Sequence, residues 1–173
     1  NTERPIQILI AGKSHPKDTI GKQLLQKINQ SFSEDFFKDR VEVIPGYNWQ
    51  LARRIVSGTD IWLNTPYRSE EACGTSGMKA AANGVIQFTT LDGWTDEVDW
   101  YKIGWVIDEN DPSTSLYNYL ENNIAPLYYS KNDQGFNEDW VIMMKNSIKL
   151  ILKDFSSERM LDDYLTKIYN RVI

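Results

Sequence analysis

Residues 71–84 read EACGTSGMKAAANG, and they are the most informative stretch of the chain. A loop of small residues leads into a predicted helix whose first turns carry Met78 and Lys79. Free N–H groups at a helix start, together with the helix dipole, favour a bound anion. A lysine just inside such a helix can pair with that anion or bond covalently to an aldehyde cofactor. The stretch therefore predicts a phosphate cradle with a reactive lysine, the plainer alternative being a solvated helix lysine.

Outward from this stretch, short apolar segments alternate with amphipathic ones. Strands are expected at 5–12, 40–45, 59–65, 85–89 and 105–107, and helices at 18–30, 49–57 and 71–84. This alternation predicts βαβ crossovers. The expected fold class is α/β, with one doubly wound parallel sheet of about five or six strands and helices on both faces.

The C-terminal third has a different character. It predicts helices at 115–123, 138–154 and 157–172, with core-facing apolar residues in the second of them: Ile142, Met143, Ile148, Leu150 and Ile151. We expect a single domain over 1–173, in which about 110–173 form a helical tail or a strap to another domain. The chain begins at Asn1 without an initiator methionine and reads as a piece of a longer protein.

Three loops are expected at the carboxyl edge of the sheet, where open α/β sheets bind ligands. They are residues 12–16, 46–48 and 64–75. In the first, Lys13 and His15 suit a phosphate or sugar contact, or simply a solvated loop with a capping histidine. In the second, Tyr47 could stack on a flat cofactor while its hydroxyl reaches a phosphate, or could be an ordinary half-buried loop residue.

Glu71 could accept hydrogen bonds from sugar hydroxyls, or could favour the helix start electrostatically. Glu70 lies next to it, and the pattern does not say which of the two points inward. The tryptophans that follow the fourth strand suit a sugar platform, but aromatic side chains at such positions more often belong to the core: Trp94, Trp100 and Trp105.

Composition excludes several classes of protein. The net charge of −5 and the lack of a basic cluster make nucleic acid an unexpected partner. A single cysteine, Cys73, excludes an internal disulfide and suits a reducing, cytoplasmic location. With one histidine in the chain, neither a metal site nor a Cys–His nucleophile is expected. No apolar run approaches membrane-spanning length.

The same residues resemble the pyridoxal-phosphate lysine signature of the glycogen (α-glucan) phosphorylase family. The positions that match are Glu71, Ala72, Cys73, Gly74, Thr75, Met78, Lys79, Asn83 and Gly84. Ala82 departs from the larger apolar residue more usual there, which affects packing rather than chemistry. IAGKSHP, PGYNWQLAR, GTDIWLNTPYR, LDGW and DFSSER are also similar to family segments of the short bacterial and archaeal type. The resemblance thus covers nearly the whole chain, as the C-terminal part of such an enzyme.

The resemblance implies two Rossmann-like domains that face each other across a cleft, the GT-B arrangement, of which this chain would be the C-terminal half. It implies release of glucose 1-phosphate from an α-1,4-glucan by inorganic phosphate, with retention of configuration. The partners implied are the glucan, phosphate, glucose 1-phosphate and an N-terminal glucan-binding domain absent from this chain, with a homo-oligomer possible. The family's substrate-phosphate arginine and lysine lie upstream of this chain, so the fragment alone is expected to be inactive.

Carried over by position, the resemblance assigns the site. Lys79 would hold pyridoxal phosphate as a Schiff base, and partial burial would lower its pKa and supply the neutral amine. Thr75, with the backbone amides of Ser76 and Gly77, would bind the cofactor phosphate, with Tyr47 beside it. The glucose contacts would come from Glu71, Cys73 and Gly74, with Glu71 and Lys79 as the catalytic residues.

Two other functions stay open. A nucleotide-sugar glycosyltransferase of the glycogen synthase kind shares the two-domain fold and a glutamate loop before a helix. Lys79 separates the two, because a nucleotide-sugar enzyme needs no Schiff-base lysine. The remaining alternative is a non-catalytic carbohydrate-binding module that has kept the fold.

Overall fold

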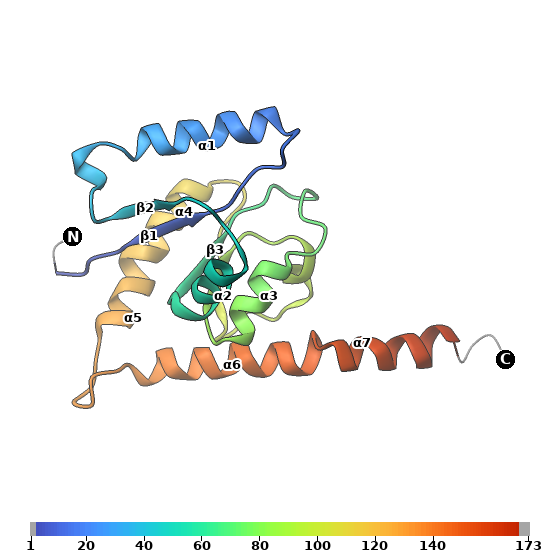
Figure 1. The fold of residues 1–173 in the computed structure, drawn as a ribbon. Coiled ribbons are helices and arrows are strands. Elements are labelled where there is room, and N and C mark those ends of the chain that lie inside the picture. The colour runs from blue at the N-terminus through green and yellow to red at the C-terminus, as the bar shows by residue number, and fades with distance from the viewer. Residues whose placement is uncertain (1–2, 170–173) are drawn as a thin grey trace. The chain divides into compact units, whose positions relative to one another are not determined.

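The computed structural model describes residues 3–169 of the chain, and within them it is an α/β protein in which every strand pair is parallel. Two compact units divide the chain, residues 1–54 and 55–173. Figure 1 shows the elements in chain order by colour. The strands are β1 (Ile8–Ala11), β2 (Val41–Ile44), β3 (Ile61–Asn64), β4 (Ile86–Thr89) and β5 (Gly104–Val106). The helices are α1 (Thr19–Ser31), α2 (Trp49–Gly58), α3 (Thr75–Ala82), α4 (Pro112–Tyr119), α5 (Ala125–Tyr129), α6 (Glu138–Asp154) and α7 (Ser157–Asp163).

The first unit is built on the β1–β2 pair, whose register runs from Ile8 opposite Val41 to Ala11 opposite Ile44. α1 connects the two strands and begins where sequence predicted, because the Asp18 side chain accepts the Gly21 N–H at 2.8 Å and so caps the helix. Since β1 and β2 are parallel, the loops that follow them lie at the same edge of this pair. That part of the expected loop arrangement is confirmed.

The second unit is built on a three-stranded sheet in the order β3–β4–β5. The parallel α/β class is confirmed, but the strands hydrogen-bond as two sheets of two and three strands rather than as the single sheet expected. An apolar pattern predicts that a segment is a strand, whereas the choice of neighbour depends on backbone pairing that the pattern does not encode. In this unit the loops after β3 and β4 share one edge.

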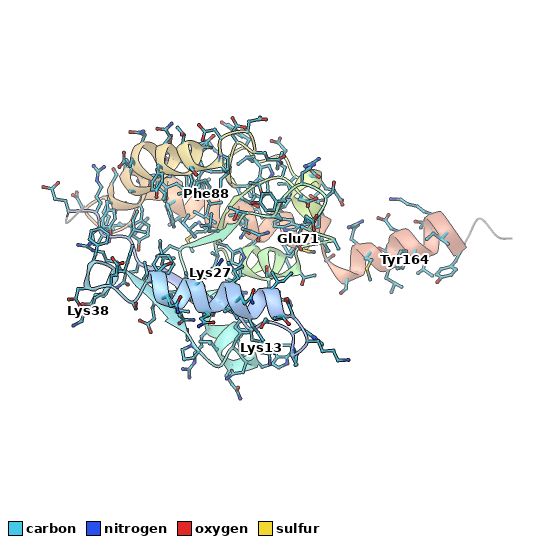
Figure 2. All side chains as sticks on the ribbon, turned by 90° about the horizontal axis from the view of Figure 1, so that it is seen from above. Lys13, Lys27, Lys38, Glu71, Phe88 and Tyr164 are labelled. Atoms are coloured by element: carbon cyan, nitrogen blue, oxygen red, sulfur yellow. The ribbon has the colours of Figure 1, made fainter. Side chains whose placement is uncertain are left out.

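β4 is the centre of the second unit, and all four of its residues are buried. Ile86 and Phe88 point to one face, where they pack in a cluster with Ile107, Ile124, Trp140 and Met143 from the following elements. Figure 2 labels Phe88. Gln87 points to the other face, towards α3, where Gly77 lies against its side chain. Helices therefore cover both sides of this sheet, and the alternation of side chains along β4 separates the two layers.

The C-terminal helices follow the prediction closely in position. α6 has the expected bounds and lies alongside α3 (Figure 1). The predicted helix at 115–123 begins earlier, at Pro112, because Asp111 caps it, and a π-helical turn at Leu120–Ile124 joins it to α5. The predicted helix at 157–172 is α7 followed by a π-helical turn at Tyr164–Ile168, and its remainder lies outside the described residues.

One predicted core residue of α6 is wrong. Ile142 is 42% exposed, whereas Met143 and Ile151 are buried as expected. The buried stripe of the helix runs through Ser147, which is fully buried and whose hydroxyl donates to the Ile103 carbonyl. Across residues 3–169, the helices are all too short or too polar to cross a membrane.

Candidate active site

Two loops of the second unit form one structure at the carboxyl edge of the sheet. The segment between β3 and α3 carries most of the predicted site residues, and the segment after β4 lies along it. The Thr90 N–H donates to the Asn64 carbonyl at 3.1 Å, and its hydroxyl donates to the Pro66 carbonyl at 2.9 Å. Further along, the Trp94 N–H donates to the Cys73 carbonyl at 3.0 Å. The second loop thus fixes the backbone of the first at both of its ends.

The middle of the same pair of loops is held by Asp92, whose residue is 7% exposed. Its Oδ2 accepts the Glu71 N–H at 2.8 Å, and its Oδ1 accepts the Gly93 N–H at 2.9 Å. Asp92 also caps the 3₁₀ helix at Gly93–Glu97, in a reciprocal pair of bonds with Thr95. The Glu71 bond, more than any other contact, lowers the pKa of this carboxyl. The stabilisation it gives is therefore complete above the ordinary aspartate pKa and is lost as pH falls through the lowered one.

Arg68 ties the outer side of the first loop to the second. Its Nη1 donates to the Leu91 carbonyl and to Asp96 Oδ1, each at 2.6 Å. Hydrogen bonding to Asp96 raises the pKa of the guanidinium, which stays charged. Ser69, the next residue, has a φ of 70°, an uncommon conformation for a side chain other than glycine. The ion pair therefore holds a tight turn directly before Glu71.

Trp94 forms the floor beneath the start of α3. Gly74, the residue before the helix, has a φ of 83°, and a Cβ there would lie 3.0 Å from Trp94 Cδ1 and 3.4 Å from Glu71 Cγ. A Cβ on Gly77 would lie 2.9 Å from Gln87 Oε1 and 3.2 Å from Trp94 Nε1. The small residues of the predicted cradle are thus required by close packing, and they bring the Glu71 side chain beside the helix start.

α3 presents one face to the interior and another to solvent. Gly77, Ala80 and Ala81 are buried, whereas Thr75, Ser76 and Lys79 are exposed. Thr75 and Lys79 are four residues apart, so they share a face, and helix side chains lean towards the N-terminus. Lys79 therefore lies on the same face of α3 as Thr75, one turn after the helix begins.

The helix start has no side-chain cap, because the capping residue is Gly74. The Gly77 N–H donates to the Gly74 carbonyl at 3.2 Å. The N–H groups of Thr75 and Ser76 precede the first intrahelical bonds, so they have no acceptor within the helix. Such groups, next to a positive dipole end, form a fitting site for a phosphate.

The predicted site residues of the second unit come together in part. Glu71 is half-buried beside Gly74, and Cys73 is exposed with its Sγ 3.9 Å from Met78 Sδ. Lys79 is exposed, so the partial burial expected for it is not found within this chain. Glu70 is exposed and Glu71 is half-buried, so Glu71 is the one of the two that turns inward (Figure 2 labels Glu71).

Three other candidates belong to the first unit. Tyr47 is half-buried directly after Gly46, and Lys13 is exposed in the loop after β1. His15 Nδ1 accepts the Lys17 N–H at 3.2 Å, a bond within the loop that precedes α1. The position of Tyr47 beside the cofactor stays a prediction, as does the convergence of these loops with α3.

The tryptophans after β4 belong to the core. Trp94 is 3% exposed and packs edge-on against Trp100 and Phe155, with ring centroids 5.9 and 5.3 Å apart. Trp105 packs against the cluster around Phe88. Across residues 3–169, no group of three or more histidine, cysteine, aspartate or glutamate side chains is placed to hold a metal ion.

Sequence reasoning missed the residues that position the site. No positioning role was predicted for Asp92 or Arg68, which stand only within the family-like segments LDGW and GTDIWLNTPYR, and Trp94 was considered only as core or sugar platform. A usable signal was present for Asp92, since an aspartate three residues before Thr95 is a helix-capping spacing. No comparable signal marks Arg68, because its partners lie 23 and 28 residues away.

A family model described as carbohydrate phosphorylase matches residues 1–102, which include both loops and α3. The chain belongs to the carbohydrate phosphorylase family. Over all of its length it is similar to a glycogen phosphorylase of Aquifex aeolicus, with 41% identity, and to a maltodextrin phosphorylase of Thermococcus litoralis, with 42% identity. A glycogen phosphorylase of Mycobacterium bovis is 38% identical over 96% of the chain.

These family members are much longer than the chain. It covers 26% of the Aquifex protein, 22% of the Thermococcus protein and 21% of the Mycobacterium protein. The chain therefore spans about a quarter of the length of the relatives it matches. The matches to the Aquifex and Thermococcus proteins extend over the whole chain, and so over the residues of both loops and α3.

The first prediction tests the floor of the cradle. Gly74→Ala should lower the free energy of unfolding in two ways: about 1–2 kcal/mol for an L side chain at positive φ, and about 1–3 kcal/mol for displacing Trp94. Gly135→Ala is the matched control, since its φ is 87° and a Cβ there meets nothing within 4 Å. Urea unfolding of both variants isolates the packing contribution as their difference. Equal losses would show that Trp94 does not limit the size of residue 74.

Proposed function

We propose that this chain is the cofactor-binding part of an α-glucan phosphorylase, which uses inorganic phosphate to release glucose 1-phosphate from an α-1,4-glucan with retention. One observation carries the proposal: α3 begins without a side-chain cap, and Lys79 is exposed one turn after that start. Membership in the carbohydrate phosphorylase family supports it, as do the relatives named as glycogen and maltodextrin phosphorylases.

The residues present fit pyridoxal phosphate. The Thr75 and Ser76 N–H groups and the Thr75 hydroxyl would hold its phosphate, and Lys79 would hold its aldehyde carbon. The Gly77 N–H already donates to the Gly74 carbonyl, so it contributes less than the sequence suggested. When bound, the cofactor would supply a phosphate group that exchanges a proton with the substrate phosphate. Larger residues at Gly74 and Gly77 would collide with Trp94 and deform this cradle.

The other residues would orient the sugar. Glu71 would accept hydrogen bonds from glucose hydroxyls, because the residue is half-buried, its Cγ lies beside Gly74 and its backbone is fixed by Asp92. Cys73 and Gly74 would lie against the sugar as the loop turns into α3. Lys79 is exposed in this chain, and the cofactor and a second domain would cover α3 and exclude water from this side chain.

The alternative of a nucleotide-sugar glycosyltransferase is less well supported. Such an enzyme needs no lysine on the face of α3, and the relatives reported above carry phosphorylase names. A non-catalytic module would not require the tightly packed cradle that Trp94 imposes on Gly74 and Gly77.

The deciding experiment uses the full-length protein. Purified enzyme should contain one pyridoxal phosphate per chain by absorbance, and should release glucose 1-phosphate from maltodextrin in the presence of phosphate. The isolated 173-residue chain should release none. A full-length protein that lacks pyridoxal phosphate and transfers glucose from a nucleoside-diphosphate glucose would refute the proposal and establish the alternative.

A further inference from the structure

We propose that Asp92 is a positioning residue of the active site, which fixes Glu71 for contact with the glucosyl group through the hydrogen bond from the Glu71 N–H. The inference rests on the proposed phosphorylase function for its substrate. The geometry on which it stands is independent of that function.

The carboxylate of Asp92 serves two elements at once. One side caps the 3₁₀ helix at Gly93–Glu97 through the Gly93 and Thr95 N–H groups. The other oxygen, Oδ2, is turned across to the opposite loop and accepts the Glu71 N–H at 2.8 Å. A cap alone needs no contact with the β3–α3 loop, so the second bond is additional to what the helix requires.

The bond acts where the first loop has few other constraints. Cys73 is held by Trp94, and Pro66 is held by Thr90. Between them, Ser69 has positive φ, and Arg68 is bonded through a half-exposed side chain. The Glu71 N–H bond to Asp92 therefore decides the backbone position of Glu71 more directly than any other contact described for this loop.

Burial makes this bond effective. Asp92 is 7% exposed, so water competes little for its oxygens, and an ionised acceptor forms a stronger hydrogen bond than a neutral one. Arg68 provides a nearby positive charge that favours the ionised form. A carboxylate held in this way keeps the Glu71 backbone in one position, and Glu71 Cγ then lies beside Gly74 at the edge of the cradle.

Asp92→Asn in the full-length enzyme is the most selective variant. The amide oxygen of the new side chain can keep the bond from the Gly93 N–H, whereas its NH₂ group would face the Glu71 N–H as donor against donor. The 3₁₀ helix therefore remains capped while the bond to the opposite loop is lost. Asp111→Asn is the matched control, because Asp111 caps α4 through the Thr114 N–H and has no part in the site.

The first readout does not depend on activity. Hydrogen exchange at the Glu71 amide, resolved by mass spectrometry of peptides covering 68–74, should be roughly 10-fold faster in Asp92→Asn than in wild type. Asp111→Asn should leave it unchanged. Unchanged exchange in Asp92→Asn would overturn the proposal whatever the kinetics show.

The second readout is kinetic. Asp92→Asn should lower kcat/KM for maltodextrin phosphorolysis by about 10- to 100-fold, because a small misplacement of a substrate contact has effects of that size. Its pyridoxal phosphate content should equal that of wild type. In a Glu71→Gln background, the same substitution should cost less than about 3-fold, because Asp92 acts through Glu71. Full additivity of the two substitutions, or activity unchanged despite faster exchange, would overturn the positioning role.

The two proposals can fail separately. An inactive wild-type enzyme that lacks pyridoxal phosphate would reject the phosphorylase function, and the exchange data would still decide whether Asp92 fixes Glu71. An active wild-type enzyme whose Asp92→Asn variant retains full activity would reject the positioning role alone.

Discussion

Lys79→Ala in the full-length enzyme should abolish both pyridoxal phosphate incorporation and phosphorolysis, while the thermal unfolding midpoint of the apoprotein stays close to that of wild type. Lys79 is exposed on α3 and belongs to neither buried hydrophobic cluster, so its loss should disturb little packing. Alanine is also a better helix former than lysine, which favours the fold. The expected fall in kcat is at least about 1,000-fold, because the substitution removes the attachment point of the group that supplies the chemistry.

Lys79→Arg is the control for charge. It keeps a cation on the face of α3 but cannot bond to an aldehyde, so it should also lose the cofactor. Borohydride treatment of wild type should leave a pyridoxyl label on the peptide that contains Lys79. A label on another lysine, or full activity in either variant, would show that the cradle on α3 does not hold the cofactor.

Trp94→Ala should be the most destabilising single substitution at the site, with a loss of about 3–5 kcal/mol in the free energy of unfolding. The indole is 3% exposed, contacts Trp100 and Phe155, and lies beneath Gly74 and Gly77. Its removal leaves a cavity under the start of α3 and should weaken cofactor binding as well. Urea unfolding and pyridoxal phosphate titration measure the two effects.

Trp49→Ala provides the comparison, because Trp49 is 87% exposed and loses little packing on truncation. It should change the free energy of unfolding by less than about 1 kcal/mol. If Trp94→Ala were as mild as Trp49→Ala, the floor of the cradle would have to be formed by other residues.

The fold could be predicted from sequence where local signals determine it. The Asp18 cap fixed the start of α1, and the apolar strands alternate with helices at the spacing of βαβ units. The prediction that Ile142 faces the core is wrong for a physical reason. The buried stripe of α6 passes through Ser147, whose hydroxyl donates to the Ile103 carbonyl. A pattern based on apolar residues does not select a serine for the core. The division of the strands between two sheets likewise depends on pairing that no local signal records.

The site, like the fold, could be predicted where its residues are contiguous in the sequence. The cradle and Lys79 follow from one contiguous stretch, and the structure places Thr75, Ser76 and Lys79 on a common exposed face. The contacts that hold this stretch come from residues about 20 positions further along the chain, as with Glu71 and Asp92. Such partners come together because β3 and β4 pair in parallel and end side by side. They can therefore be identified only from the three-dimensional structure.

The paired loops also set a rule for protein engineering. Segments 65–74 and 90–97 are joined by backbone and side-chain hydrogen bonds at Pro66, Glu71 and Cys73. The conformation of each segment therefore depends on the other. A chimera that receives the first segment from a relative will keep a working cradle only if the second segment is transplanted with it. Directed evolution of sugar specificity in such an enzyme should therefore randomise the two segments as one cassette.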